Sequence, residues 1–173
     1  KGMTTEGGIR VPAILKVPGS EKRGGQPLPA FTSVLDLLPT FLAVAGSEDV
    51  RAINPSDTDM PVLVGASLLP YLGGETVVEE RRYPYGFSVH RRQGLQYGNW
   101  KIIRLESTVG TGEWELYDLE KDPGETSNLA ISHPDVLEEM IVHWKSFADR
   151  TGIVVSEEDT RIPRECVLKA AMN

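Results

Sequence analysis

Cysteine is scarce in this chain, because Cys166 is the only one among 173 residues. A single thiol excludes an internal disulfide bond, so covalent cross-links do not hold the fold. Long apolar runs are also missing, and none approaches the ~20 residues that a membrane-spanning helix needs. We therefore expect a fold that depends on a hydrophobic core, with no membrane partner.

Basic residues are outnumbered by acidic ones, 18 against 25, which leaves a net charge of −7 and a pI near 5.0. This balance excludes a broad nucleic-acid surface, although a local basic pocket is compatible with it. The hydrophobic fraction of 40% and the charged fraction of 25% are those of ordinary globular proteins and argue against disorder. The length suits one medium domain or two small ones.

The first twelve residues place Lys1, Glu6, Arg10 and several glycines in one short stretch, which is the composition of a functional loop. Gly7-Gly8 permits positive φ and close approach of another group. Glu6 and Arg10, four positions apart, are expected to form an ion pair that braces the loop. The following run, Val11–Val17, predicts a short buried strand.

A helix is predicted next, capped by Thr32 or Asp36 and ended by Gly46. Pro39 is tolerated in its first turn, where the backbone N–H groups have no intrahelical acceptor. Its apolar stripe consists of Leu37, Leu38, Phe41, Leu42 and Ala45. A second apolar segment, Val62–Leu72, ends at a glycine pair.

The second half of the chain predicts an antiparallel sheet of aromatic and β-branched runs at residues 82–90, 93–97, 100–105 and 114–119. Gly98-Asn99 has the form of a tight hairpin turn. A helix follows, with Ser132 and Asp135 in a capping-box pattern, Pro134 in its first turn and Gly152 at its end. Its apolar residues should cover one face of the sheet, namely Leu137, Met140, Ile141, Trp144, Phe147 and Ala148.

Other conspicuous residues are interpreted as structural. Trp100, Trp114 and Trp144 have the spacing of core residues, and the charged turn Glu120–Glu125 lacks the ligand spacing of a calcium loop. His133 and His143 have no evident partner residues for chemistry. His90 with Arg91-Arg92 fits a solvated strand end as well as the mouth of a site.

Four stretches together carry a resemblance to a known family: KGMTTEGGIRVPAI, TSVLDLLPTFLAVAG, GNWKIIR and ELYDLEKDPGETSNLA. In this order they resemble the C-terminal portion of the type I sulfatases, the arylsulfatase family of the alkaline phosphatase superfamily. The resemblance implies an α/β fold in which residues 1–75 form the C-terminal edge of the catalytic core. Residues 76–173 would form an α+β subdomain, a small antiparallel sheet covered by one helix. Because residue 1 falls inside the first motif, with no initiator Met or signal peptide, we expect a piece of a longer chain.

The resemblance also implies a site. Lys1 matches the family lysine that contacts the substrate sulfate, so it is the catalytic and substrate-binding candidate. The family nucleophile is a formylglycine made from a Cys/Ser-x-Pro-x-Arg motif, and it works beside a calcium ion. Cys166 is followed by neither the proline nor the arginine of that motif. The formylglycine and the calcium ligands are therefore expected upstream of Lys1, with no metal ligand in this chain.

The predicted function is that of a fragment of a sulfuric ester hydrolase, inactive without its N-terminal catalytic core. Its substrate would be an aryl or carbohydrate sulfate, and a periplasmic, secreted or lysosomal location would fit the family. Two alternatives stay open: a phosphonate or phosphate monoester hydrolase of the same superfamily, and a non-catalytic interaction module in which Lys1 lies on the surface.

Overall fold

The structure is a computed structural model that describes residues 2–16, 25, 27, 31–46, 65–72 and 84–154. The chain divides into two compact units, one formed by Lys1–Pro12 with Arg82–Asn173 and the other by Ala13–Arg81. The first twelve residues therefore group with the second half of the chain. The predicted domain boundary at residue 75 stays a prediction. No described helix is both long and apolar enough to cross a bilayer.

The larger unit is built on a four-stranded antiparallel sheet in the order β1-β2-β3-β4. Its strands are Tyr85–Val89, Arg92–Tyr97, Trp100–Arg104 and Trp114–Asp118. Gly98, with φ of +56°, makes the tight turn between β2 and β3 that the sequence predicts. The α/β class with a small antiparallel sheet covered by one helix is confirmed.

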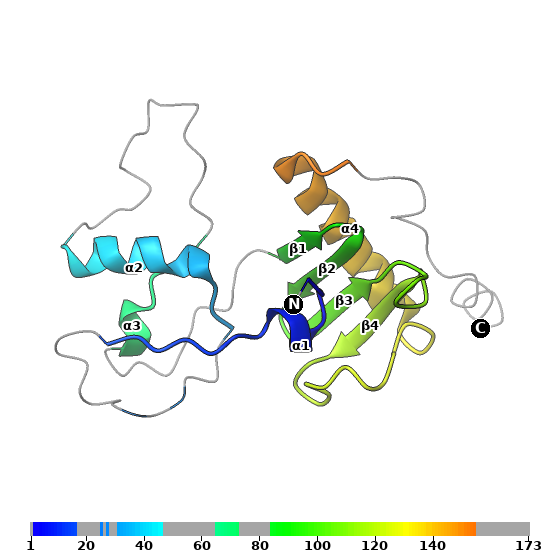
Figure 1. Cartoon of the computed structure of the whole chain (residues 1–173), viewed down its shortest axis with the longest axis horizontal. Helices are drawn as coiled ribbons and strands as arrows, with labels where there is room; N and C mark the ends of the chain where they lie inside the picture. The colour runs from blue at the N-terminus through cyan, green and yellow to red at the C-terminus, as the bar shows by residue number, and fades with distance from the viewer. Residues whose placement is uncertain are drawn as a thin grey trace. The chain divides into compact units, whose positions relative to one another are not determined.

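Helix α4, Pro134–Thr151, covers one face of this sheet (Figure 1). The core between them contains Trp114 and Trp144, with ring centroids 5.7 Å apart, so the reading of these tryptophans as core residues is confirmed. The other buried members are Leu95, Ile102, Leu116, Ala130, Leu137, Met140, Ile141 and Ala148. Burial of this apolar area is the main term that stabilises the unit.

The ends of α4 are partly as predicted. Pro134 occupies the first turn, and Gly152 ends the helix in the left-handed conformation with φ of +69°. The predicted capping box is wrong, because the N-cap is His133, which makes no side-chain cap bond. The Ser132 hydroxyl instead donates to the backbone oxygen of Leu129 at 3.1 Å, which holds it in the preceding turn.

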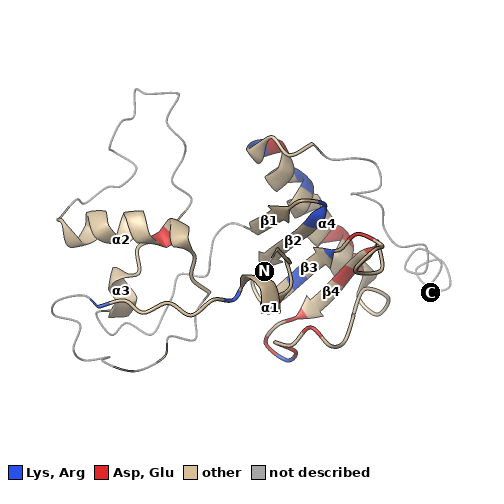
Figure 2. Cartoon of the chain, in the orientation of Figure 1, with Lys and Arg blue, Asp and Glu red and all other residues tan. Residues whose placement is uncertain are grey.

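In the smaller unit, the 3-10 turn η2, Val34–Asp36, leads into helix α2, Leu37–Val44. Ser33 is the N-cap of η2 and forms a capping box with Asp36. Of the two predicted caps, Asp36 is the N-cap of α2, although its side chain makes no cap hydrogen bond there, and Thr32 is not a cap. Gly46 has φ of +79°, as expected for a residue that stops a helix. Within Val34–Val44 only Asp36 is charged (Figure 2).

Buried Asp36 also ties α2 to the segment before α3, Leu69–Leu72. Its carboxylate accepts hydrogen bonds from the backbone N–H groups of Ser33 at 2.7 Å and Ala66 at 2.9 Å. A Cβ on Gly65 would lie 2.0 Å from the backbone oxygen of Leu35, so this close approach requires glycine.

The predicted strand Val11–Val17 is wrong over the residues that the structure describes, which end at Lys16. The segment forms no strand, and Val11 and Ile14 are 76% and 99% exposed. A strand exists only through hydrogen bonds to a neighbour. The four described strands pair with one another, so an apolar run alone does not make residues 11–16 a strand.

Candidate functional site

The N-terminal loop, Gly2–Arg10, packs on the face of the sheet opposite α4, which we call the loop face (Figure 1). It contains the short helix α1, Glu6–Ile9. Met3 packs against an apolar cluster on that face made of Ile103, Leu105, Tyr117 and Leu119. The sequence predicts a cover for one face of the sheet only, so this second cover is a finding of the structure.

Two hydrogen bonds join the start of the loop to strand β2. The buried Thr4 hydroxyl donates to the backbone oxygen of Gln93 at 3.0 Å. The guanidinium of Arg92 donates to the backbone oxygen of Gly2 at 2.6 Å and also binds Glu106, with its closest contact at 2.7 Å. Arg92 is thereby oriented by a carboxylate while it holds the residue next to Lys1.

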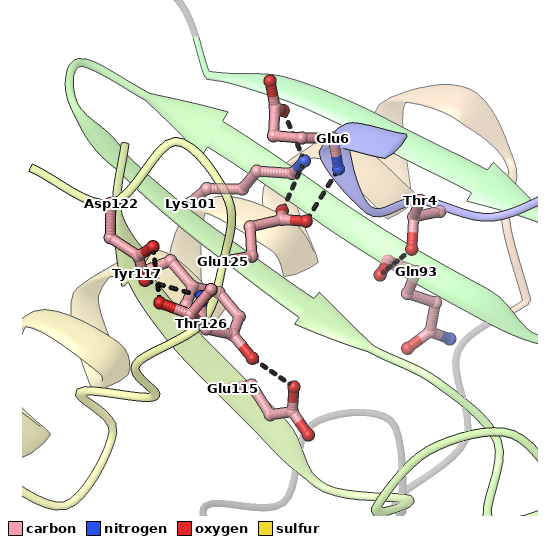
Figure 3. A network of polar contacts seen from close by, with 9 residues as sticks. All are labelled: Thr4, Glu6, Gln93, Lys101, Glu115, Tyr117, Asp122, Glu125 and Thr126. Atoms are coloured by element: carbon pink, nitrogen blue, oxygen red, sulfur yellow. Dashed lines mark hydrogen bonds and ion pairs between the residues drawn. The ribbon is translucent and has the colours of Figure 1, made fainter. Parts of the chain in front are cut away.

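Lys101 lies on the loop face, since it pairs with Gln96 and Tyr117 in the neighbouring strands, and its side chain is 0% exposed. Its Nζ atom contacts Oε1 of Glu6 at 2.6 Å and Oε1 of Glu125 at 2.8 Å (Figure 3). A buried ammonium needs such partners, because burial without them is very costly.

The two carboxylates are also linked through the backbone, because the N–H of Glu6 donates to Oε2 of Glu125 at 2.7 Å. Glu125 therefore binds both the lysine of β3 and the first residue of α1. We call Glu6, Lys101 and Glu125 the loop anchor. It brings one basic and two acidic side chains together, and it connects three segments that are far apart in the sequence.

Glu125 is presented by a tight turn in which its own φ is +54°, an uncommon value for a residue other than glycine. Asp122 stabilises that turn by accepting hydrogen bonds from the backbone N–H groups of Thr126 at 2.7 Å and Ser127 at 2.8 Å. These bonds, with that from Ser127 the largest cause, lower the pKa of Asp122 below its usual range. The charged turn at residues 120–125 thus serves to place one carboxylate.

Tyr117 lies beside the loop anchor on β4, and its hydroxyl donates to Oε2 of Glu115 at 2.6 Å (Figure 3). Burial, together with the negative charge of Glu115, raises the pKa of Tyr117 well above its usual range. The phenol therefore stays protonated and acts as a donor at the edge of the apolar cluster.

The structure describes only some of the residues that the sequence singles out. Lys1 and Cys166 lie outside the described residues. The expected ion pair between Glu6 and Arg10 is wrong, because Glu6 binds Lys101 while Arg10 is exposed. The physical reason is that a buried cation competes far better for a carboxylate than a solvated one does.

Lys101 and Glu125 are the members of the site that the sequence interpretation missed. A usable signal was present, because Trp100, Ile102 and Ile103 are apolar residues on both faces of one strand. A lysine among them must be buried as well, and a buried lysine needs a carboxylate partner. The pattern does not say which of the 25 acidic residues that is.

The described residues do not fit a metal centre. Among them no group of three or more His, Cys, Asp or Glu side chains is arranged to hold an ion. The carboxylates of the loop anchor face an ammonium, and His133 packs against Trp100 with ring centroids 5.6 Å apart. Their chemistry is that of ion pairing and packing.

Comparison with known proteins identifies the group to which this chain is similar. Residues 1–145 match the family model described as N-sulphoglucosamine sulphohydrolase, C-terminal. An uncharacterized sulfatase of Schizosaccharomyces pombe is 34% identical over 164 residues, which are 92% of this chain and 28% of that protein. Human arylsulfatase A is 30% identical over 155 residues, covering 80% of this chain and 30% of the relative.

A bacterial relative extends the comparison. The N-acetylglucosamine-6-O-sulfatase of Bacteroides thetaiotaomicron is 34% identical over 130 residues, 69% of this chain and 21% of that protein. The crystal structure of Ps i-CgsB shares the fold, with a TM-score of 0.52 at 21% identity over 80% of this chain and 29% of its own. This chain therefore spans less than a third of these relatives, and it belongs to the sulfatase family as a counterpart of their C-terminal part.

Proposed function

We propose that this chain is part of a hydrolase of sulfate monoesters, in which Lys1 contacts the sulfate group of the substrate. The observation that carries this is the anchored N-terminal loop: it lies within the family match, and Gly2 and Thr4, which follow Lys1, are bound to the sheet. A loop held in this way can present one side chain at a defined place.

The chemistry follows from the charge that develops in the reaction. As the sulfur–oxygen bond breaks, the leaving oxygen gains negative charge, so a fixed ammonium stabilises the transition state more than the ground state. Lys1 would supply that ammonium. Its role is electrostatic, and the substrate is an aryl or carbohydrate sulfate.

Other groups of the reaction would come from elsewhere. As the resemblance implies, a formylglycine beside a bound calcium ion would supply the nucleophile, both in the part of the protein upstream of Lys1. We therefore expect residues 1–75 to complete that catalytic core, residues 76–173 to form the smaller subdomain, and the isolated chain to be inactive.

The test replaces Lys1 by alanine in the intact protein. We expect kcat on an aryl sulfate to fall about 10²–10³-fold, the scale for removing one preorganised transition-state partner. Lys1→Arg should rescue only in part, because a planar guanidinium does not reproduce one compact charge. Lys16→Ala, which removes an exposed lysine of the same segment, should leave kcat unchanged.

The same assay separates the alternatives. A phosphate or phosphonate ester with the same leaving group, turned over faster than the sulfate, would identify the other hydrolase of the superfamily. An intact protein that turns over none of these esters would indicate the interaction module. Lys1→Ala with unchanged kcat and a raised KM would place Lys1 in uniform binding and remove it from catalysis.

A further inference from the structure

Burying the ionic groups of the loop anchor costs hydration free energy. A buried lysine with two carboxylates has lost its hydration, and such groups are often no more stabilising than apolar residues of the same size. Met3 already attaches the loop by packing against the apolar cluster on the loop face. The ionic contacts therefore contribute something other than attachment.

The ionic contacts fix the position of the loop along the sheet. Apolar contacts tolerate small displacements, whereas charged hydrogen bonds of 2.6 and 2.7 Å do not. Glu6 is held at two points, its carboxylate by Lys101 and its backbone N–H by Glu125 (Figure 3). A shift of the loop along the sheet would break both contacts together.

The loop anchor holds one end of a short segment, residues 2–6. Between Lys1 and Glu6 the chain is bound again at Gly2, by Arg92, and at Thr4, by the backbone of β2. Gly2 has φ of +75°, so the chain direction just after Lys1 is set by a conformation that glycine favours. These contacts hold residues 2–6, the segment that directly follows Lys1 in the sequence.

Lys101 is not itself a group that meets substrate. Its ammonium is enclosed by the two carboxylates, and its side chain is fully buried. Arg92 likewise is oriented by Glu106 and binds a backbone oxygen. These cations can influence a reaction only through the loop that they hold.

We propose that Lys101 and Glu125 are positioning residues, which fix Glu6 and thereby the place of Lys1 relative to the sulfate of the substrate. The proposal rests on the proposed function of Lys1. Misplacement of a catalytic group by about 1 Å costs on the order of 10²-fold in rate, so loss of the anchor should be visible in kcat.

The experiment compares Lys101→Met and Glu6→Ala in the intact protein with two controls. Met140→Ala weakens the core on the α4 side without touching the loop, and its loss in Tm is measured beside that of Lys101→Met. Lys145→Met removes an exposed lysine of α4, outside the turn that presents Glu125. Glu6→Ala leaves Lys101 paired with Glu125. It therefore tests the role of the loop anchor even if Lys101→Met folds poorly.

We expect kcat to fall about 10-fold to 10²-fold in Lys101→Met and Glu6→Ala, with KM changing less, and to stay near wild type in both controls. In a Lys1→Ala background the two anchor substitutions should have no further effect on kcat, because they act through Lys1. An equal loss of kcat in Met140→Ala, or an undiminished effect without Lys1, would overturn the positioning role.

Amide exchange on the 173-residue chain gives a readout that needs no activity. The backbone N–H groups of Glu6, Gly8 and Arg10 are hydrogen bonded in the docked loop, so they should exchange about tenfold faster or more in Lys101→Met and remain slow in Met140→Ala. Unchanged exchange in Lys101→Met would show that the anchor does not hold the loop and would overturn the proposal.

The failures of the two proposals are distinguishable. If Lys1→Ala leaves kcat unchanged, the proposed function of Lys1 is wrong and its positioning falls with it. If Lys1→Ala lowers kcat while Lys101→Met and Glu6→Ala do not, only the positioning role is overturned.

Discussion

The Nζ atom of Lys101 lies 2.6 Å from Oε1 of Glu6, although 95 positions separate the two residues in the chain. Through this contact, strand β3 holds the loop that follows Lys1. The opposite face of the same sheet carries α4. This small sheet thus carries a helix on one face and the anchored N-terminal loop on the other.

Replacing Lys101 alone should lower the free energy of unfolding more than replacing all three residues of the loop anchor. Lys101→Met leaves Glu6 and Glu125 without their counter-ion, and breaking a buried pair typically costs about 3–5 kcal/mol of unfolding free energy. The triple variant with Glu6→Gln and Glu125→Gln should recover part of that loss, because it buries no unpaired charge. Denaturant unfolding measures both, and a triple variant less stable than Lys101→Met would contradict this account.

Two adjacent glycines of α1 should respond in opposite ways to alanine. A Cβ on Gly8 would lie 2.5 Å from the backbone oxygen of Met3, whereas a Cβ on Gly7 meets nothing within 4 Å. Gly8→Ala should therefore displace the loop and speed amide exchange at Glu6. Gly7→Ala should leave the loop docked and be neutral or slightly stabilising, by up to about 1 kcal/mol. Equal effects of the two substitutions would show that this loop is not packed as described.

Trp144→Ala should destabilise the sheet-containing unit by roughly 3–5 kcal/mol, the range for deleting a large aromatic side chain from a core. Trp144 is fully buried and packs against Trp114 and Phe147. Val142→Ala, at an exposed position of the same helix, is the control and should change little. Thermal or denaturant unfolding decides the matter, and a loss under about 1 kcal/mol would mean that α4 does not cover the sheet.

Acid should weaken the turn that presents Glu125. The pKa of Asp122 is lower in the folded chain than its ordinary value, so its carboxylate contributes stability above the unfolded pKa. That contribution is lost as the pH falls through the folded pKa. The difference in unfolding free energy between wild type and Asp122→Asn should therefore shrink as the pH falls below about 5.

Comparing wild type with Asp122→Asn separates the titration of Asp122 from that of Asp118. The hydrogen bond and charge of Lys121 also lower the pKa of Asp118, which titrates in the same acidic range but is common to both proteins. A difference that stays constant with pH would show that the turn does not depend on the charge of Asp122.

Local features were predictable where the physical cause is local. The hairpin at Gly98-Asn99, the stop at Gly152 and the apolar stripe of α4 follow from backbone sterics and helical periodicity, which a short stretch of residues contains in full. Cap positions were predictable only in part. Asp36 is the N-cap of α2 as predicted, but the capping box before it uses Ser33, which is chemically equivalent to Thr32 and one residue away.

The sequence alone determined the family, through four motifs in order, and the alternation that makes the second half an antiparallel sheet. Tertiary structure decided what the charged residues do. A strand pattern reports that Lys101 is buried, but ion pairing is a contact in space, and the partners Glu6 and Glu125 come from segments on either side of it in the chain. For the same reason Val11–Lys16, apolar in sequence, forms no strand: hydrogen bonding to a neighbour is decided by the fold, not by the segment itself.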